Sequence, residues 1–290
     1  MNIEQINLKK KAYAVYNLSK DDSVDKKVIS YAKSRVEENR DLFETLIKVC
    51  GDEITFDELL KVFDEESGEG LYKKEKTLTI VKNSYYSGVY TTSVGSLAVE
   101  VDNTLDALRY FIKAVKSRNA ITISDLEYLE NDVKNCLMLI FKSSLEKYGL
   151  DPNLIDIMPF EECYYERFDK AIIVTDNVVI DNKQRSDKYY IYIDDDKFKT
   201  EAFKDLQLFR SKGMIVELLS GTFEKVLEKI NSSISKGASI YTSDGNNAFR
   251  FINLVDADNV FVNASLDNVE EVEHLDSSFY HKKKIMYPVG

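Results

Sequence analysis

The sequence has few of the residues on which most catalytic sites depend. Among 290 residues there are two histidines, His274 and His281, and three cysteines, Cys50, Cys136 and Cys163. Both histidines lie near the C-terminus, which limits His-based acid–base chemistry. The cysteines are widely spaced and odd in number, so they predict neither a disulfide framework nor the paired spacing of a zinc site. A reducing cytoplasm is the location that these cysteines favour.

Long apolar runs and an excess of positive charge are also absent. No stretch of about 18 apolar residues occurs, so no transmembrane helix is expected, and the first residues contain no apolar core of a signal peptide. Lys and Arg total 39 against 50 Asp and Glu, a formal net charge of -11. This charge opposes binding to nucleic-acid phosphates and to anionic membranes. We therefore expect a soluble protein whose partner is a small molecule or another protein.

The hydrophobic pattern alternates between the periods of helices and strands. Apolar residues recur with a period near 3.6 over Val24–Val49, which predicts one long helix, and Thr55 followed by Glu58 has the spacing of a capping box. Further helices are expected at Phe56–Phe63, Thr104–Val115, Leu126–Tyr148, Lys197–Lys212, Phe223–Ser235 and Asn246–Val255. Strands are expected at Thr77–Val81, Gly88–Thr92, Ala120–Ser124, Leu154–Met158, Lys170–Thr175, Tyr189–Ile193, Met214–Leu218, Ala238–Thr242 and Asn259–Asn263. This alternation predicts a doubly wound α/β fold with a largely parallel sheet.

The polar segment Thr175–Lys188 is the best candidate for a domain junction. It divides the chain into a Rossmann-like domain at residues 1–176 and a smaller α/β unit at residues 177–265. The tail, residues 266–290, could return to the first domain. Its Lys282–Lys284 run beside His281 could contact an anionic ligand, although three lysines more often form a solvated face.

The segment Ser239–Ser265 combines a strand, a helix and a second strand with a distinctive set of polar residues. The helix carries Arg250, Phe251, Asn253, Val255 and Asp256, and the second strand ends in Asn263, Ala264 and Ser265. This arrangement resembles the γ-glutamyl phosphate reductase family (glutamate-5-semialdehyde dehydrogenase) of the aldehyde dehydrogenase superfamily. Other segments similar to that family are Val115–Ser124, the turn Tyr148–Pro152, Ala202–Ser220 and the closing KKKIMYPVG.

The resemblance implies an aldehyde-dehydrogenase-like fold, with a Rossmann-like domain and a truncated catalytic-like domain. It also implies NADP as cofactor if the family activity is retained, and a homodimer. By the same resemblance, the cofactor would contact Lys116, Asn119 and Ser124. The substrate would contact Asn263 and Ser265, although a polar strand end that enters a turn explains these two residues equally well.

The family's nucleophile is missing from its expected place. The reaction of the family needs a cysteine thiolate that attacks the acyl phosphate or aldehyde carbon. The corresponding stretch, Lys183–Tyr190, contains no cysteine, and Ser186 has no neighbouring base. Cys163 is the remaining candidate for a catalytic residue, but the adjacent glutamates stabilise its neutral thiol over the thiolate. A half-buried position on a short helix is the favoured alternative for Cys163.

The residues expected to hold the cofactor also depart from the family pattern. Arg118 replaces a glycine, and Ser124, Asp125 and Leu126 replace an Arg-Gly-Gly run that lets the backbone approach nucleotide phosphates. No G-x-G-x-x-G or P-loop sequence occurs elsewhere. The sequence therefore predicts that the NADP site is lost or remodelled.

Asp194–Asp196 follow a predicted strand and precede a helix. Carboxylates at such a position can hold Mg²⁺, but capping of the helix explains them more simply, and no metal is expected. Three functions are thus compared: a non-catalytic binding or assembly module, an NADP-dependent reductase of γ-glutamyl phosphate or a related acyl phosphate or aldehyde, and a metal-assisted small-molecule enzyme. The first is favoured because the core pattern is intact while the chemical positions are changed, and under it no cofactor is expected.

Overall fold

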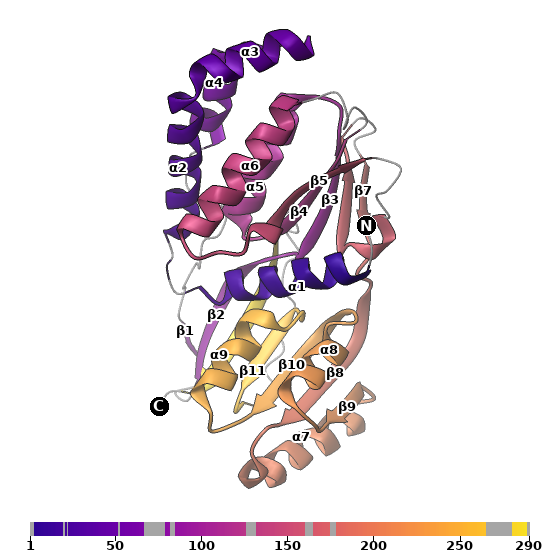
Figure 1. The fold of residues 1–290 in the computed structure, drawn as a ribbon. Coiled ribbons are helices and arrows are strands. Elements are labelled where there is room, and N and C mark those ends of the chain that lie inside the picture. Colours follow the sequence, from indigo (N-terminus) through magenta and orange to yellow (C-terminus); the bar gives the residue numbers. More distant parts are fainter. Residues whose placement is uncertain are drawn as a thin grey trace. The chain divides into compact units, whose positions relative to one another are not determined.

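The computed structural model of the chain describes residues 3–19, 21, 23–51, 53–66, 79–81, 85–125, 132–159, 165–174, 178–264 and 280–288. These residues form two compact units (Figure 1). The first unit comprises residues 1–72, 93–182 and 277–280, and the second comprises residues 73–92, 183–276 and 281–290. The boundary at residue 182 lies inside the polar segment Thr175–Lys188.

The first unit is built on a five-stranded sheet in the order β5-β4-β3-β6-β7. The strands are β3 (Ser96–Val101), β4 (Ala120–Asp125), β5 (Ile155–Pro159), β6 (Lys170–Ile173) and β7 (Val178–Asp181). All neighbours are parallel except β7, which runs antiparallel to β6. Because β3 and β4 are covered on both faces, every side chain in them is buried, as is typical of parallel sheets.

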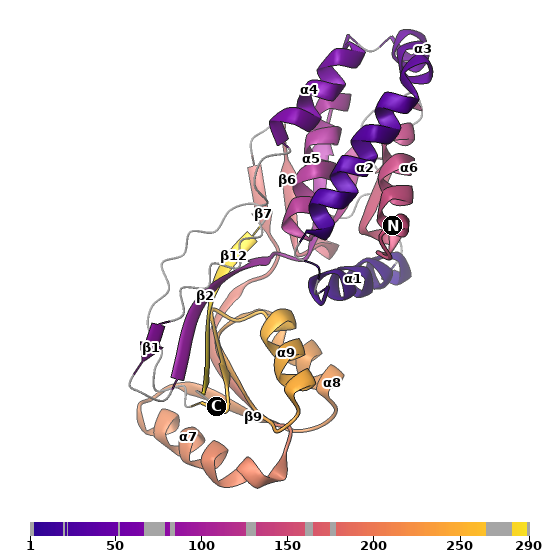
Figure 2. The same cartoon turned by 90° about the vertical axis from the view of Figure 1, so that its left-hand side faces the viewer.

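Six helices of the first unit are described: α1 (Ile3–Asn17), α2 (Val24–Glu38), α3 (Arg40–Cys50), α4 (Phe56–Glu66), α5 (Thr104–Ser117) and α6 (Asp132–Lys147). In Figures 1 and 2, α2, α5 and α6 lie side by side. The buried face of α2, formed by Val28, Ala32 and Val36, belongs to the same apolar core as Phe111 and Phe141.

The prediction of a single helix over Val24–Val49 is wrong, because the chain bends at Asn39. The backbone of Asn39 leaves the helical region at φ -108° and ψ 29°, so that α2 ends and α3 begins there. Its side-chain Nδ2 donates to the carbonyl oxygen of Arg35 at 2.7 Å, a local bond that competes with continuation of the helix. The capping box before α4 is confirmed. The Thr55 backbone N–H donates to Glu58 Oε2 at 2.7 Å, and the Glu58 N–H donates to Thr55 Oγ1 at 3.3 Å.

The second unit contains a seven-stranded sheet in the order β1-β2-β12-β11-β10-β8-β9. The strands are β1 (Thr79–Val81), β2 (Tyr85–Ser93), β8 (Arg185–Ile193), β9 (Ile215–Leu219), β10 (Ile234–Tyr241), β11 (Asn259–Val262) and β12 (Tyr280–Pro288). From β9 through β12 all neighbours are parallel, and β1 and β2 form an antiparallel pair. The α/β fold with largely parallel sheets is thus confirmed.

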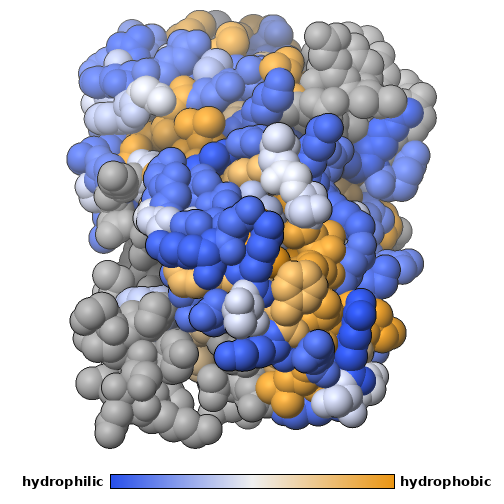
Figure 3. All heavy atoms as spheres, turned by 90° about the horizontal axis from the view of Figure 1, so that it is seen from below, coloured by the Kyte–Doolittle hydropathy of each residue, from blue (hydrophilic) through white to orange (hydrophobic). Residues whose placement is uncertain are grey.

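Helices cover both faces of the parallel part of this sheet. One core contains Leu206 and Phe209 of α7 (Lys199–Ser211), and the other contains residues of α8 (Phe223–Ile230) and α9 (Gly245–Leu254). Figure 3, a view from the side on which α7 and β9 lie in Figure 1, shows apolar side chains gathered at the surface. The large exposed residues of α7 and β9 are Phe203, Leu208 and Ile215. Within the described residues, no helix is both long and apolar enough to cross a lipid bilayer.

Candidate functional site

The carboxyl ends of the parallel strands are the usual place for a ligand in an open α/β sheet. In the first unit, Glu100 lies one residue before the end of β3, and Ser124 and Asp125 are the last residues of β4. The Tyr165 hydroxyl lies 2.8 Å from Glu100 Oε2 and 3.1 Å from Ser124 Oγ. Lys134 Nζ, from the first turn of α6, donates to Asp125 Oδ1 at 2.8 Å, and both side chains are 1% exposed. The polar groups at this edge therefore bind one another.

This internal network is poorly suited to the phosphates of a dinucleotide. A pyrophosphate beside Asp125 would meet a carboxylate of the same charge sign and would compete with it for Lys134. Breaking a buried ion pair of this kind leaves a charge in a poorly solvated place, which is costly. A dinucleotide could therefore bind at this edge only if the network rearranged.

Two of the three residues expected at the cofactor lie near the amino ends of the parallel strands, opposite the carboxyl ends described above. Lys116, at the end of α5, donates from Nζ to the carbonyl oxygen of Glu66 at 2.5 Å. Asn119 accepts from the Gly95 backbone N–H at 2.9 Å and donates to Ser117 Oγ at 2.7 Å. Both precede β4, whereas Ser124 lies near the end of that strand, and the length of the strand separates the Cα atoms of Asn119 and Ser124 by roughly 15 Å. The structure does not bring Lys116 and Asn119 together with Ser124.

In the second unit, the ends of β8, β10 and β11 are joined by a second polar network. Asp194 accepts hydrogen bonds from Thr242 Oγ1 at 2.5 Å, from Tyr192 at 2.9 Å and from Asn247 Nδ2 at 3.0 Å. Burial alone would raise the pKa of Asp194, but these hydrogen bonds outweigh burial and hold it below its usual value. Asp194 is therefore a carboxylate surrounded by donors from three elements.

Asn263, one of the two residues expected at the substrate, completes this network. Its backbone is left-handed, with φ 48°. Its Oδ1 accepts from the Thr242 N–H at 2.9 Å, and its Nδ2 donates to the Thr242 carbonyl oxygen at 2.8 Å. The side chain thus connects the ends of β10 and β11. The other expected substrate residue, Ser265, lies outside the described residues.

The capping function expected of Asp194–Asp196 is confirmed for the middle residue. Asp195 accepts from the Lys197 backbone N–H at 3.0 Å at the start of the short 3-10 helix Asp196–Phe198, which leads into α7. In the part of the chain that the structure describes, no group of three His, Cys, Asp or Glu side chains is arranged to hold a metal ion.

The described cysteines lie on helices of the first unit. Cys50 ends α3 and Cys136 lies in α6, and both are half-buried. Burial, with a smaller contribution from Asp132, raises the pKa of the Cys136 thiol. Cys163 lies outside the described residues. The stretch expected to carry the nucleophile is Lys183–Tyr190. From Arg185 onward it belongs to strand β8, which pairs with β10.

Solved structures provide the decisive comparison. The γ-glutamyl phosphate reductase of Thermotoga maritima aligns with a TM-score of 0.54 at 12% identity, covering 98% of this chain and 97% of that chain. The γ-glutamyl phosphate reductase of Saccharomyces cerevisiae aligns with a TM-score of 0.51 at 14% identity, covering 97% and 96%. The chain has the γ-glutamyl phosphate reductase fold. No protein-family model and no curated protein matches the sequence.

A further structure with a similar fold contains bound NADP. The glyceraldehyde-3-phosphate dehydrogenase of Methanocaldococcus jannaschii, complexed with NADP, aligns with a TM-score of 0.52 at 10% identity, covering 98% of this chain and 93% of that chain. The two segments whose sequences most resemble the γ-glutamyl phosphate reductase family lie on helices and strands of the core of this chain. Ser239–Ser265 includes α9 and β11, and Val115–Ser124 leads from α5 into β4. The expected resemblance is confirmed at the level of the fold.

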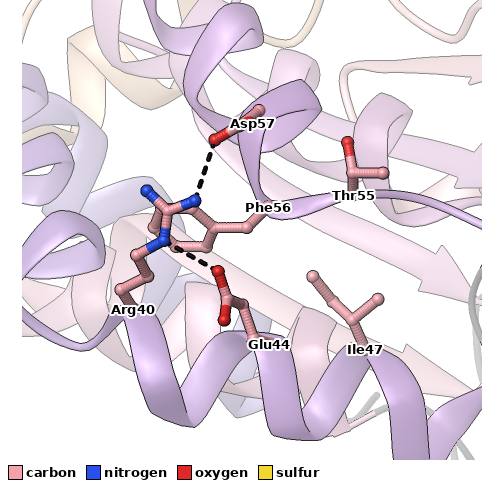
Figure 4. Close-up of a pocket in the computed structure, with 6 residues that line it drawn as sticks. All are labelled: Arg40, Glu44, Ile47, Thr55, Phe56 and Asp57. Atoms are coloured by element: carbon pink, nitrogen blue, oxygen red, sulfur yellow. Dashed lines mark hydrogen bonds and ion pairs between the residues drawn. The ribbon is translucent and has the colours of Figure 1, made fainter.

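A groove between α3 and α4 is one of the hollows on the first unit, with a volume of about 270 Å³. Arg40 lies across it, as Figure 4 shows. Its guanidinium donates to Glu44 at 2.7 Å and to Asp57 at 3.2 Å, and it lies 4.7 Å from the centroid of the Phe56 ring. Because the guanidinium of Arg40 is already held by both carboxylates of this groove and by the Phe56 ring, we assign the groove to packing of the two helices.

Sequence reasoning missed several residues of both networks, including Lys134, Tyr165, Thr242 and Asn247. Lys134 gave a detectable signal, because it lies between Val133 and Leu137 on the apolar stripe of its helix. A charged residue at a buried helix position needs a partner, and Asp125 at the preceding strand end supplies it. For Tyr165 no such signal exists, since its contacts with Glu100 and Ser124 depend on tertiary structure.

Proposed function

We propose that this chain is a cytoplasmic binding or assembly module with the γ-glutamyl phosphate reductase fold that does not carry out the thiol chemistry of such reductases. The supporting observation is the buried Asp125–Lys134 pair at 2.8 Å, which lies at the strand ends where a cofactor would be expected. The charged groups at these strand ends therefore already have partners among the chain's own side chains.

The chemistry of acyl phosphate reduction supports the same proposal. A thiolate must attack the carbonyl carbon and expel phosphate, and the resulting thioester must accept a hydride from NADPH. Burial favours the neutral thiol of Cys136, which is a poor nucleophile. Cys163 is the cysteine on which a working reductase would have to depend.

The direct test is an assay of the purified protein in the oxidative direction, with glutamate-5-semialdehyde, NADP⁺ and phosphate. We expect no NADPH formation above the rate without protein. Turnover in the ordinary enzyme range of about 1 s⁻¹ or more would overturn the proposal. If turnover occurred, Cys163→Ala should abolish it and Cys136→Ala should leave it, which would establish the reductase alternative.

A thermal-unfolding series tests cofactor and metal binding separately from catalysis. A ligand that binds only the folded state raises the melting temperature when its concentration exceeds the dissociation constant. We expect no shift with NADP⁺, NADPH, Mg²⁺ or Mn²⁺. A shift with NADP(H) would favour the reductase, in which NADP is the cofactor, and a shift with either metal would favour a metal-assisted enzyme at Asp194–Asp196.

A further inference from the structure

A second groove of the first unit runs along α2 beside the end of α6. Its volume is about 450 Å³, within the size range of small-molecule sites. Helices α2 and α6 lie side by side in both ribbon views (Figures 1 and 2). The groove is lined by Ser23, Lys26, Lys27, Ser30, Tyr31, Ser34 and Tyr148.

The sequence of α2 explains why these side chains share one face. The lining residues follow one another at intervals of three and four, which places them in a row along the helix. Val28, Ala32 and Val36 occupy the opposite, buried face. The row therefore remains at the surface as a continuous polar strip, and Tyr148 closes it from the end of α6.

The groove carries positive charge that carboxylates only partly neutralise. Lys147 does not line the groove, but its Nζ lies 3.4 Å from the centroid of the Tyr31 ring and adds positive charge beside the groove. Lys27 pairs with Asp21 at 2.6 Å. The Lys26 side chain has no hydrogen bond or ion pair with any described residue, and no carboxylate lines the groove. This is a local cationic site in a chain of net charge -11.

Three hydroxyl groups of the groove are also available to a ligand. Within the described residues, the side chains of Ser30, Tyr31 and Tyr148 form no hydrogen bond. The rings of Tyr31 and Tyr148 lie edge to face, with centroids 6.3 Å apart. The groove thus offers ammonium groups, hydroxyl groups and aromatic surface within one hollow.

We infer that this groove binds an organic phosphate, that is, a nucleotide or a sugar phosphate. Ammonium groups bind phosphate oxygens through charge-assisted hydrogen bonds, which the lining residue Lys26 can provide. The hydroxyl groups can bind the remaining polar atoms, and the tyrosine rings can pack against a base or a sugar ring. The inference goes beyond the proposed function, because it holds whether or not the chain catalyses a reaction.

The test is isothermal titration calorimetry of the full chain at constant ionic strength. The ligands are adenosine monophosphate, glucose 6-phosphate, their uncharged counterparts adenosine and glucose, and inorganic phosphate. We expect saturable binding of at least one ester, about tenfold tighter than binding of its uncharged counterpart and of inorganic phosphate. Binding of adenosine monophosphate alone identifies a nucleotide site, and binding of glucose 6-phosphate alone identifies a sugar phosphate site.

Variants locate the binding in the groove. Lys26→Glu should weaken binding of the ester about tenfold, Lys26→Gln less, and Tyr31→Phe about threefold, because each removes a donor. The control is Lys225→Glu, which makes the same charge change at an exposed position of α8 and should leave the affinity within about twofold. Lys26 is exposed, so the folded state should tolerate both substitutions.

Three results would overturn the inference. The first is the absence of saturable binding of either ester. The second is equal affinity for an ester and for inorganic phosphate, which is the behaviour of a solvated lysine face. The third is an affinity of Lys26→Glu within about twofold of that of Lys225→Glu, since the charge of the groove would then contribute nothing specific.

Discussion

Charged residues that lie inside the protein carry much of what distinguishes this chain. Lys134 and Asp125 form a buried ion pair, and Lys9 of α1 donates from its buried Nζ to the carbonyl oxygens of Ile121 and Asn153 at 3.2 and 3.0 Å. Lys134 lies in α6 and Lys9 in α1, and both are buried although they are charged. Charge in a sequence is therefore an unreliable guide to the surface of this protein, and the partner of each charge has to be identified.

Lys134→Met should lower the free energy of unfolding by about 3–5 kcal/mol, because it leaves the buried Asp125 carboxylate without its cation. Urea denaturation measures this change. The matched control is Lys61→Met, since the Lys61 side chain is 73% exposed and pairs with Glu65 at the surface. The control should change stability by less than about 0.5 kcal/mol. Equal effects of the two substitutions would show that the buried pair contributes nothing.

Lys283 is buried, although a run of three lysines is expected at the surface. The Lys282–Lys284 run has the pattern of a solvated face, yet Lys283 is 1% exposed and donates to the Val255 carbonyl oxygen at 3.2 Å. Burial lowers the pKa of Lys283 from 10.5 to about 8, although Asp256 opposes the shift. The strand β12 brings this lysine to Val255, the residue that follows α9, and no local sequence pattern predicts that contact.

The lowered pKa of Lys283 predicts a specific pH dependence of stability. Between pH 8 and 10.5 the unfolded chain keeps the proton that the folded protein has lost, so raising the pH through this window should stabilise the folded state. The expected gain, relative to Lys283→Met, is on the order of 1 kcal/mol per pH unit. Urea denaturation of both proteins at several pH values measures this gain. Other groups that titrate in this range, such as Lys9, contribute equally to the stability of both proteins and drop out of the difference. A constant difference between the two proteins would contradict the prediction.

At the scale of elements, the strand and helix pattern was predictable and the interruptions were not. Most core strands and helices were expected within a few residues, because their apolar periodicity is strong. The break at Asn39 was missed, since one apolar stripe continues through α2 and α3. The helix α1 and the strands β3, β7 and β12 were also missed. The apolar residues of α1 do not form a single stripe, and all four residues of β7 are exposed at the edge of its sheet.

The start of β3 depends on a glycine. Gly95 has φ 119°, and a Cβ at this position would collide with the Asp169 carboxylate, which accepts from the Ser96 N–H and Oγ at 2.8 Å each. Gly95→Ala should therefore cost more than about 2 kcal/mol of stability. Gly213→Ala is the control, because it has φ 75° but no atom within 4 Å of the new Cβ, and it should cost about 1 kcal/mol. Denaturant titration of both variants separates the collision from backbone strain.

At the scale of the whole molecule, the fold was predictable from two segments and the candidate site was not. Ser239–Ser265 and Val115–Ser124 occupy core elements, where packing sets the pattern of apolar residues. The contacts of the site residues depend on tertiary structure: the resemblance predicts that Lys116 and Asn119 contact a cofactor, and in the structure their side chains bind Glu66, Gly95 and Ser117.

The two units have separate hydrophobic cores, which has a consequence for unfolding. Each buried apolar cluster of described residues lies within one unit: Leu137 belongs to the first and Ile240 to the second, and both are 0% exposed. Proteins with several domains commonly unfold in more than one step. Calorimetry should therefore resolve two transitions. Leu137→Ala and Ile240→Ala should each weaken one transition by about 2–5 kcal/mol and leave the other unchanged.

The organic phosphate inferred for the α2 groove offers an independent assignment of these transitions. Its proposed site lies wholly in the first unit, so saturating ligand should raise the transition that Leu137→Ala lowers. The transition that Ile240→Ala lowers should not move. A single transition that both substitutions lower equally would show that the two cores unfold as one cooperative unit. The ligand would then stabilise the whole chain, and the division into two units would describe its packing but not its stability.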